Sequence, residues 1–434
     1  MPDELERETT DLLARLVATN TVNPPGNERP AQELLARLLG DAGFEVELLG
    51  RTADRPNLLA RLRGRADGPT LCLLSHVDTV LADPAEWERD PWSGEVVDGV
   101  LWGRGAQDMK SQTAAEVTGA IALAREGWRP PRGDLLVAVV VDEETGGSEG
   151  AVWLTEEHPD KARCDMLLNE GAGTVIPFEG GSVYGVCVAE KGVFRFTVTT
   201  DGVAGHASMP KMGENALLKM VPVLQAIAER QPAYDVTDTP RSLLAALGVP
   251  LDGDPVAALR ALHERDPVLA VLVEPMLGVT LAPTRISASD KINVIPSRAR
   301  LQVDCRTPPG MGREQVLRRI HEVLGGDGYR VDFTEEVVGN SSPADTPLMD
   351  ALRGWVTRED PDAQVVPTML PAFTDSRTFR DAFPECVAYG FFPQREMNLY
   401  ETSPLIHSRD ERIATADLGF AARCYRDVAR ELLG

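Results

Sequence analysis

The sequence lacks any apolar run that approaches the length of a membrane span, so we expect no membrane partner. Its first six residues include three acidic ones, and they lack the basic stretch followed by an apolar stretch that marks a signal peptide. Cysteine is scarce, because the chain has only six, which lie far apart and form no CxxC pair. These absences predict a cytoplasmic protein with reduced, buried thiols rather than disulfides or a thiolate zinc site.

Positive charge is also in short supply. The chain has 44 Lys and Arg residues against 67 Asp and Glu residues, which gives a net charge of −23. Such a balance argues against nucleic acid and anionic membranes as partners. The length of 434 residues exceeds what one compact core accommodates, so two or more domains are expected. A hydrophobic content of 43% is ordinary for a globular protein.

The run Leu71–Ser75 is mostly apolar and ends abruptly in His76-Val77-Asp78. A short apolar run with polar residues at its end is typical of a buried strand in a parallel sheet. Ligands of such sheets bind outside the carboxyl ends of the strands, and alternation directs both polar side chains to one side. His76 therefore suits a metal ligand that Asp78 orients. The alternative is a solvent-exposed strand end with no function.

Similar polar ends recur along the chain. The apolar run 134–141 ends in Asp142-Glu143-Glu144, and the run before Glu170 ends the same way. Adjacent carboxylates repel one another unless a cation neutralises them, so these strand ends point to a metal. Asp108 opens an apolar helix over 111–125, where it is either a helix cap or a further carboxylate at the same sheet edge.

Four motifs carry a resemblance to a known family. They are Ser75-His76-Val77-Asp78-Thr79, Gly103-Arg104-Gly105 through Asp108-Met109-Lys110, Glu143-Glu144-Thr145-Gly146-Gly147, and Asn169-Glu170-Gly171. In this order and spacing they resemble the M20 metallopeptidases, over almost the whole chain. That family includes aminoacylases, acetylornithine deacetylases, succinyl-diaminopimelate desuccinylases, carnosinase-like dipeptidases and carboxypeptidases.

The resemblance implies an α/β fold with a mixed, largely parallel sheet flanked by helices, as in zinc exopeptidases. It also implies an inserted α+β lid or dimerisation domain. We expect residues 1–190 and 308–434 to form the catalytic metal-binding domain and residues 191–307 to form the lid. Residues 231–283 make this lid longer than a minimal one, and the sequence assigns them no function.

The resemblance also implies a set of metal ligands. Asp108 is expected to bridge two metal ions, with His76 and Glu170 completing one site and Glu144 and His407 the other. Nitrogen and oxygen ligands without thiolate suit two Zn²⁺ per subunit, with Co²⁺ or Mn²⁺ as substitutes. Two metals that share a carboxylate hold a water between them.

Three further residues receive catalytic roles. Glu143 is expected to take a proton from that water and pass it to the leaving amine, and Asp78 to orient His76. His206, in the lid, is the candidate donor to the oxyanion of the tetrahedral intermediate. In dimeric relatives the lid histidine reaches the partner's active site, so we expect a homodimer formed through the lid. The alternative is that His206 is only a turn residue.

Substrates of these relatives mostly end in a free carboxylate, for which a bidentate arginine is the natural receptor. Asn293 and Arg306 are the candidates, with Arg377 as a further one. Arg306 has the alternative of being an exposed charge at a strand end. Phe373 stands where the family has glycine, which bears on any backbone contact to the substrate there.

Together these features predict a dizinc hydrolase that cleaves the amide bond of a small substrate, an N-acyl amino acid or a short peptide with a free carboxylate. The alternative within the class is a biosynthetic deacylase of the succinyl-diaminopimelate desuccinylase or acetylornithine deacetylase type. A metal-free binding protein and a structural dimer scaffold are the alternatives from other classes. The complete ligand set and Glu143 favour the enzyme.

Overall fold

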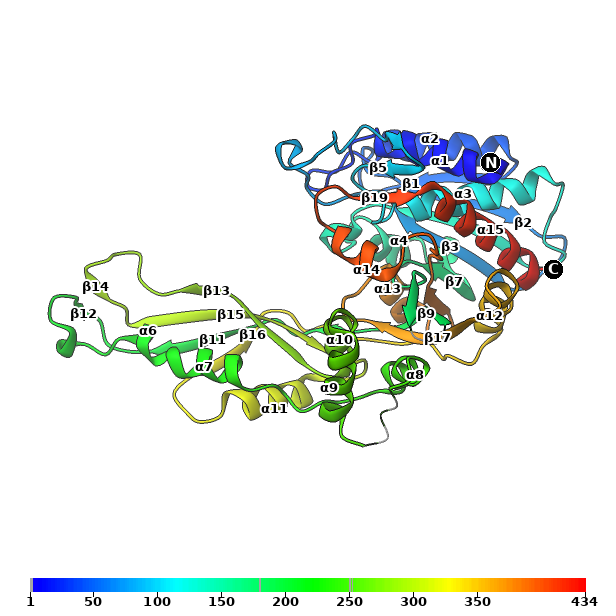
Figure 1. Cartoon of the computed structure of the whole chain (residues 1–434). Helices are drawn as coiled ribbons and strands as arrows, with labels where there is room; N and C mark the ends of the chain where they lie inside the picture. Colours follow the sequence, from blue (N-terminus) through cyan, green and yellow to red (C-terminus); the bar gives the residue numbers. More distant parts are fainter. Residues whose placement is uncertain (1–2, 179–180, 250, 252) are drawn as a thin grey trace. The chain divides into compact units, whose positions relative to one another are not determined.

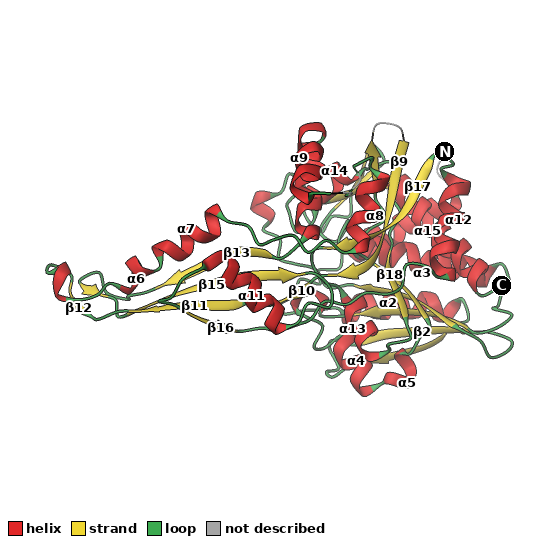
Figure 2. Ribbon diagram, turned by 90° about the horizontal axis from the view of Figure 1, so that it is seen from below, coloured by secondary structure: helices red, strands yellow, loops and turns green. Residues whose placement is uncertain are grey.

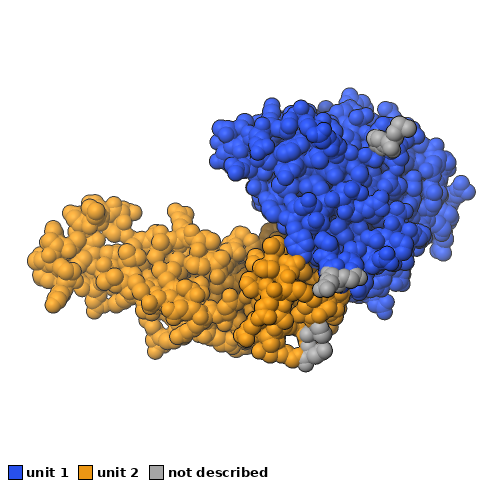
Figure 3. Space-filling view, viewed as in Figure 1, with its two compact units in different colours: residues 1–188, 342–368, 374–434 blue, residues 189–341, 369–373 orange. Residues whose placement is uncertain are grey.

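The structure is a computed structural model that describes residues 3–178, 181–249, 251 and 253–434. The chain divides into two compact units (Figure 3). Unit 1 comprises residues 1–188, 342–368 and 374–434, and unit 2 comprises residues 189–341 and 369–373.

A mixed sheet forms the centre of unit 1 (Figure 1). Its strands follow the order β1-β2-β6-β3-β7-β18-β9-β17, and β8 pairs with β9. The parallel centre consists of β6 (Asp134–Val140), β3 (Thr70–His76), β7 (Met166–Asn169) and β18 (Val387–Gly390). The flanking strands are β1 (Glu45–Leu49), β2 (Asn57–Arg63), β8 (Val175–Phe178), β9 (Gly181–Glu190) and β17 (Ala363–Leu370). The central strands are almost continuously apolar, because helices cover both of their faces.

One face of this sheet packs against a helical layer built around α3 (Lys110–Arg125). Helix α3 contacts α1 (Glu4–Val17) and α15 (Thr415–Leu432), and α15 also contacts α12 (Pro347–Glu359). Because α3 lies between the sheet and these helices, it is buried on nearly every side. Thr415 Oγ1 donates to Glu6 Oε1 at 3.0 Å, which joins the first turns of α15 and α1.

The opposite face carries shorter helices. Apolar side chains of α4 (Ala151–Glu157), α5 (Pro159–Ala162) and α13 (Asp375–Ala382) form one core with those of β2, β3, β6, β7 and β18. The remaining helices of unit 1 are α2 (Arg29–Asp41) and α14 (Leu399–Thr402). A small separate sheet joins β4 (Val96–Val97), β5 (Val100–Trp102) and β19 (Arg412–Ala414). The predicted α/β fold class is confirmed.

Unit 2 is built on an antiparallel sheet with helices along it (Figure 2). Its strands are β10 (Gly192–Val193), β11 (Phe196–Asp201), β13 (Thr280–Ser287), β15 (Arg298–Thr307) and β16 (Arg330–Phe333). Helices α7 (Val221–Glu229) and α11 (Arg313–Leu324) share a core with this sheet, and α6 (Ala216–Lys219) precedes α7. The two-stranded ribbon of β12 (Gly205–His206) and β14 (Val294–Ile295) lies at one end of the unit.

The long segment 231–283 folds mainly into helices: α8 (Asp238–Ala246), α9 (Pro255–Arg265) and α10 (Pro267–Val273). The buried Lys191 anchors its final part, because Nζ donates to the carbonyls of Pro275 and Gly278, both at 2.7 Å. Burial lowers the pKa of this amine to about 7.

The predicted domain boundary after residue 307 differs from this division. Residues 308–341 lie in unit 2, because β16 pairs with β11 from Phe196↔Phe333 to Thr199↔Arg330 and α11 packs against α7. Residues 369–373 also lie in unit 2. A helix followed by a strand is a pattern that either unit could contain, so the sequence does not locate the boundary. The pairing of β16 with β11, across more than 130 residues, assigns this segment to unit 2.

The six cysteines are all buried with free thiols. Among the described residues, no helix combines the length and the apolar character that crossing a membrane requires.

Candidate metal centre

Four side chains of the candidate centre come from the carboxyl ends of three adjacent strands. His76 is the last residue of β3, Glu143 and Glu144 follow β6, and Glu170 follows β7. The sheet order β6-β3-β7 places these strand ends side by side. Because the three strands are parallel, their polar ends meet at one edge of the sheet, as the sequence predicted.

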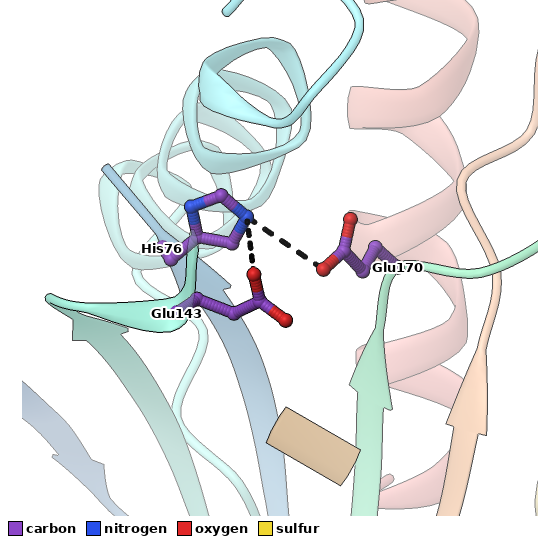
Figure 4. A group of neighbouring side chains, drawn as sticks. All are labelled: His76, Glu143 and Glu170. Atoms are coloured by element: carbon purple, nitrogen blue, oxygen red, sulfur yellow. Dashed lines mark ion pairs between the residues drawn. The ribbon is translucent and has the colours of Figure 1, made fainter. Parts of the chain in front are cut away.

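His76 is surrounded by carboxylates. Its Nε2 lies 3.6 Å from Glu170 Oε1 and 4.0 Å from Glu143 Oε2 (Figure 4). The same nitrogen lies 3.3 Å from Asp108 Oδ1. Nδ1 lies 3.1 Å from the carbonyl oxygen of Asp78, which can only accept, so Nδ1 carries a proton. In the neutral ring Nε2 then presents a lone pair to three carboxylates. That arrangement is repulsive unless a cation or a second proton lies between them.

Nε2 of His76 is itself buried, and within the described part of the chain it has no hydrogen-bond partner. Buried polar atoms are normally hydrogen-bonded, so a buried nitrogen without a partner indicates a site for a bound ion or water. This atom and the surrounding oxygens therefore fit a divalent cation.

A second group lies on the other side of Asp108. His407 Nε2 is 3.1 Å from Asp108 Oδ2 and 3.1 Å from Glu144 Oε2. His407 follows a short 3-10 turn (Ser403–Leu405) and adopts a left-handed backbone with φ 57°. Each oxygen of Asp108 thus faces a different histidine. The five residues predicted to bind two metals are close together, with Asp108 between the two halves.

Charge balance within this cluster explains the pKa shifts. Burial, together with the charge of Asp108, raises the pKa of Glu170 to about 7. Bonds to Asp108 and Glu144 raise the pKa of His407 to about 10. Burial opposes ionisation of Asp108, yet its two histidine partners outweigh this effect and lower its pKa. The cluster therefore needs positive charge, which protons or divalent cations can provide, and its nitrogen and oxygen donors suit zinc-like ions.

Asp78 does more than contact His76. Its Oδ1 lies 3.5 Å from His76 Nδ1, and the same carboxylate accepts from the backbone N–H groups of Glu143 and Glu144, both at 3.2 Å. The side chain of Asn23 also donates to Asp78 Oδ2 at 2.9 Å. Asp78 therefore fixes the turn that presents Glu143 and Glu144 as well as the histidine ring.

Asp142 is not part of the cluster, although the sequence places it beside Glu143. It accepts from Arg55 Nη1 at 3.1 Å, Asn23 Nδ2 at 3.1 Å and Thr145 Oγ1 at 2.6 Å. Burial opposes its ionisation, but these donors lower its pKa. The expected repulsion among three adjacent carboxylates is thus relieved for Asp142 by protein donors rather than by a metal.

Sequence reasoning missed two residues that hold this centre. Asn23 lies in an Asn-Pro-Pro-Gly segment, and Glu411 lies four positions after His407. The side chain of Glu411 accepts from the backbone of the loop that carries Asp108. Neither residue has a local signal, because their partners lie 55 and about 300 positions away in the sequence.

Other predicted residues lie in unit 2. His206 and Asn293 both belong to the end formed by β12 and β14, where the N–H of Ala207 donates to the carbonyl of Asn293 at 3.1 Å. The backbone N–H of Ser208 donates to His206 Nδ1 at 3.2 Å. Because Nδ1 accepts, the proton of a neutral His206 ring lies on Nε2, which leaves the exposed edge of the ring as a donor.

Arg306 lies at the opposite end of the sheet of unit 2. Residues 298–306 of β15 span about 27 Å at ~3.4 Å per residue. The guanidinium donates to Asp304 Oδ1 at 2.7 Å and lies over the ring of Phe373 at 5.8 Å. Arg306 and Asn293 of one chain therefore do not meet on the same carboxylate.

Arg377 belongs to unit 1, in the first turn of α13. Its Nη1 lies 4.0 Å from Asp381 Oδ2. The side chain of Asn169, the last residue of β7, donates to Thr374 Oγ1 at 3.2 Å and to Ser376 Oγ at 3.1 Å. This segment thus adjoins the end of β7, which carries Glu170.

Comparison with known proteins agrees with this architecture. A family model described as peptidase family M20/M25/M40 matches residues 72–431. Succinyl-diaminopimelate desuccinylase from Paracoccus denitrificans is 29% identical over 97% of both chains. Succinyl-diaminopimelate desuccinylase 2 from a Ruegeria species is 32% identical over 51% of this chain and 54% of its own length. The M20 metallo-carboxypeptidase Sso-CP2 from Sulfolobus solfataricus superposes with a TM-score of 0.72 at 17% identity, over 100% of this chain and 99% of that one.

Proposed function

The chain belongs to peptidase family M20/M25/M40 and is a metal-dependent hydrolase, and from this membership we propose that it is a dinuclear amidohydrolase. Its substrates would be N-acyl amino acids or short peptides that end in a free carboxylate. The observation that carries the proposal is the position of Asp108, whose two oxygens face His76 at 3.3 Å and His407 at 3.1 Å. This is the arrangement expected of a carboxylate shared by two cations.

His76 and Glu170 would hold one ion, Glu144 and His407 the other, and Asp108 both. Two bound ions would activate a water and polarise the scissile carbonyl. Zn²⁺ fits this ligand set, and Co²⁺ or Mn²⁺ would substitute for it.

Glu143 is the proposed general base. Of the three carboxylates around His76 Nε2 it is the most distant, at 4.0 Å, so it is the one available for proton transfer. Asp78 holds its backbone N–H, which keeps the side chain over the cluster. Glu143 would take a proton from the attacking water and pass it to the nitrogen of the leaving amine.

His206 is the proposed donor to the developing oxyanion. The proton on its Nε2 and its exposure at the end of unit 2 suit that role. Asn293 lies at the same end, and we propose that both residues act across a homodimer formed through unit 2.

Arg306 is the proposed receptor for the substrate carboxylate, with Arg377 as a second candidate. Asp304 fixes the Arg306 guanidinium, and an ordered arginine binds a carboxylate with less loss of side-chain freedom. The curated relatives are named succinyl-diaminopimelate desuccinylases, which favours an N-succinyl amino acid as the second candidate substrate. We place the reaction in the cytoplasm, consistent with six free, buried thiols.

A substrate panel tests this function. The protein is stripped with a chelator and assayed on N-acetyl amino acids, N-succinyl-diaminopimelate and dipeptides, before and after addition of Zn²⁺ or Co²⁺. We expect metal to restore cleavage of one group. His407→Ala should abolish the restored activity, whereas His321→Ala, on α11 beside Tyr329, should retain it. Equal cleavage with and without bound metal would contradict the proposal.

A further inference from the structure

We propose that Glu411 is a positioning residue for the metal centre: its carboxylate fixes the loop that carries Asp108 and ties that loop to the segment that carries His407. The inference rests on the proposed function, since it concerns how two of the proposed ligands are held. In the described part of the chain the Glu411 carboxylate bonds to the loop before Asp108 and to neither histidine, so its effect would pass through the backbone.

The carboxylate of Glu411 is saturated with donors from one loop. Oε1 accepts from the backbone N–H groups of Gln107 at 2.6 Å and Asp108 at 2.8 Å. Oε2 accepts from the backbone N–H of Gly105 at 3.0 Å and from Arg104 Nη1 at 2.7 Å. Four donors thus converge on two oxygens, and the side chain of Glu411 is fully buried.

The backbone of Glu411 fixes the same loop from the other direction. Its carbonyl accepts from the N–H of Gly103 at 2.9 Å, and the next residue begins β19, which pairs with β5 from Arg412↔Trp102 onward. Glu411 also lies four positions after His407. One residue therefore joins the two loops that present Asp108 and His407.

Only a carboxylate of this length satisfies these donors. A glutamine would replace one oxygen with an NH₂ group, which would face N–H donors and leave them unsatisfied in a buried site. Arg104 is also buried, lies over Trp87 at 5.1 Å and donates to the carbonyl of Leu81 at 3.2 Å. Removing the charge of Glu411 would leave this guanidinium without its counter-ion.

The consequence falls on Asp108. Its two oxygens face two histidines at 3.3 and 3.1 Å, so a shift of its backbone alters both proposed sites together. Residues that orient ligands in this way typically contribute about 10- to 100-fold to metal affinity.

Asp417 offers a matched control. It is a second fully buried carboxylate, and it accepts three backbone N–H groups: Arg395 at 2.7 Å, Glu396 at 2.9 Å and Met397 at 3.0 Å. None of these residues is a proposed ligand. Glu411→Gln and Asp417→Asn therefore remove comparable bonds, but only the first removes them from a ligand loop.

The experiment is a Co²⁺ titration of the chelated full-length proteins, read by the visible absorption of bound cobalt and by metal analysis. Urea unfolding of the same samples reports stability. We expect Glu411→Gln to bind Co²⁺ about 10- to 100-fold more weakly than wild type, and Asp417→Asn to stay within about threefold. Two cobalt ions bound to folded Glu411→Gln at wild-type affinity would overturn the inference.

A second variant covers the case in which Glu411→Gln does not fold. Glu411→Asp keeps the charge opposite Arg104 but draws the carboxylate back by one methylene group from the three amides. We expect its Co²⁺ affinity to fall at least threefold, and an unchanged affinity would overturn the inference. If wild type itself binds no cobalt, the proposed function fails and this inference fails with it. If wild type binds cobalt and the Glu411 variants bind it with the same affinity, the proposed function stands and only this inference fails.

Discussion

Replacing Asn23 with alanine should destabilise unit 1 and disturb the candidate metal centre, because one buried amide joins the ends of two strands. Asn23 Nδ2 donates to Asp78 Oδ2 at 2.9 Å, at the end of β3. The same nitrogen lies 3.1 Å from Asp142 Oδ1 and 3.1 Å from Thr145 Oγ1, in the turn after β6. That turn carries Glu143, the proposed base.

The magnitude follows from the number of hydrogens. The amide has two N–H groups for three acceptors, so at most two full bonds are lost, each worth about 1.5 kcal/mol when a carboxylate accepts. Both carboxylates keep other donors, Glu144 N–H for Asp78 and Arg55 for Asp142, so neither is left unsatisfied. We therefore expect a loss of about 3 kcal/mol in the free energy of unfolding, or roughly 6 °C in Tm.

Urea unfolding of wild type and Asn23→Ala measures this loss, and the isosteric Asn23→Asp is the matched control. The new carboxyl would lie beside Asp78 and Asp142, so its pKa in the folded state would be raised above that in the unfolded state. The folded variant then binds more protons, and its stability falls as pH rises from about 4 to 7. The reasoning is refuted if Asn23→Ala unfolds within 0.5 kcal/mol of wild type, or if Asn23→Asp shows no such pH dependence.

Three further predictions follow from the same structure. Glu143→Gln should keep its metal and lose about 10²- to 10⁴-fold in kcat. Glu144→Gln removes a carboxylate oxygen 3.1 Å from His407 and should lose metal. Metal analysis together with kcat distinguishes the two variants, and equal metal contents would contradict the assignment. Arg306→Ala should raise KM about 10- to 100-fold with little change in kcat. Phe373→Leu should raise KM less, because the ring only stacks on the guanidinium. Steady-state kinetics on the preferred substrate test both variants, and a change in kcat alone would argue against carboxylate binding. Lys191→Met should flatten the pH dependence of stability, because the amine has a pKa of about 7 in the folded state against 10.5 in the unfolded state. From pH 7 to 9 the free energy of unfolding of wild type should therefore rise by about 2 kcal/mol relative to the variant. Urea unfolding across this range tests the prediction, and an equal pH dependence of the two proteins would refute it.

The sequence alone indicates that the candidate ligands at strand ends lie near one another. His76, Glu144 and Glu170 each follow a short apolar run, and the rule that parallel strands present their carboxyl ends together brings them to one edge. Asp108 and His407 lie in loops rather than at strand ends. The position of Asp108 before an apolar helix left a helix cap as an alternative, and His407 was expected only from the family resemblance.

The supporting residues were beyond sequence reasoning for a different reason. Asn23 and Glu411 act through contacts across 55 and about 300 positions, and nothing adjacent to either residue signals its partner. Similarly, residues 308–341 read as a resumed catalytic domain until β16 is seen to pair with β11. Arg306 and Asn293, only thirteen positions apart, lie at opposite ends of a sheet because β15 is fully extended between them.

The packing of α1 against α15 has a consequence for synthesis. Thr415 bonds to Glu6 across 409 positions, and the apolar face of α1 contacts both α3 and α15. At about 5–20 residues per second, a ribosome needs about 20–80 s to deliver α15 after α1 has emerged. The strands of the sheet of unit 2 all come from residues 192–333, so they can pair within that interval. During this interval the apolar face of α1 is only partly covered, even though the sheet of unit 2 can already have formed. This waiting period is when we expect the nascent chain to depend most on chaperones.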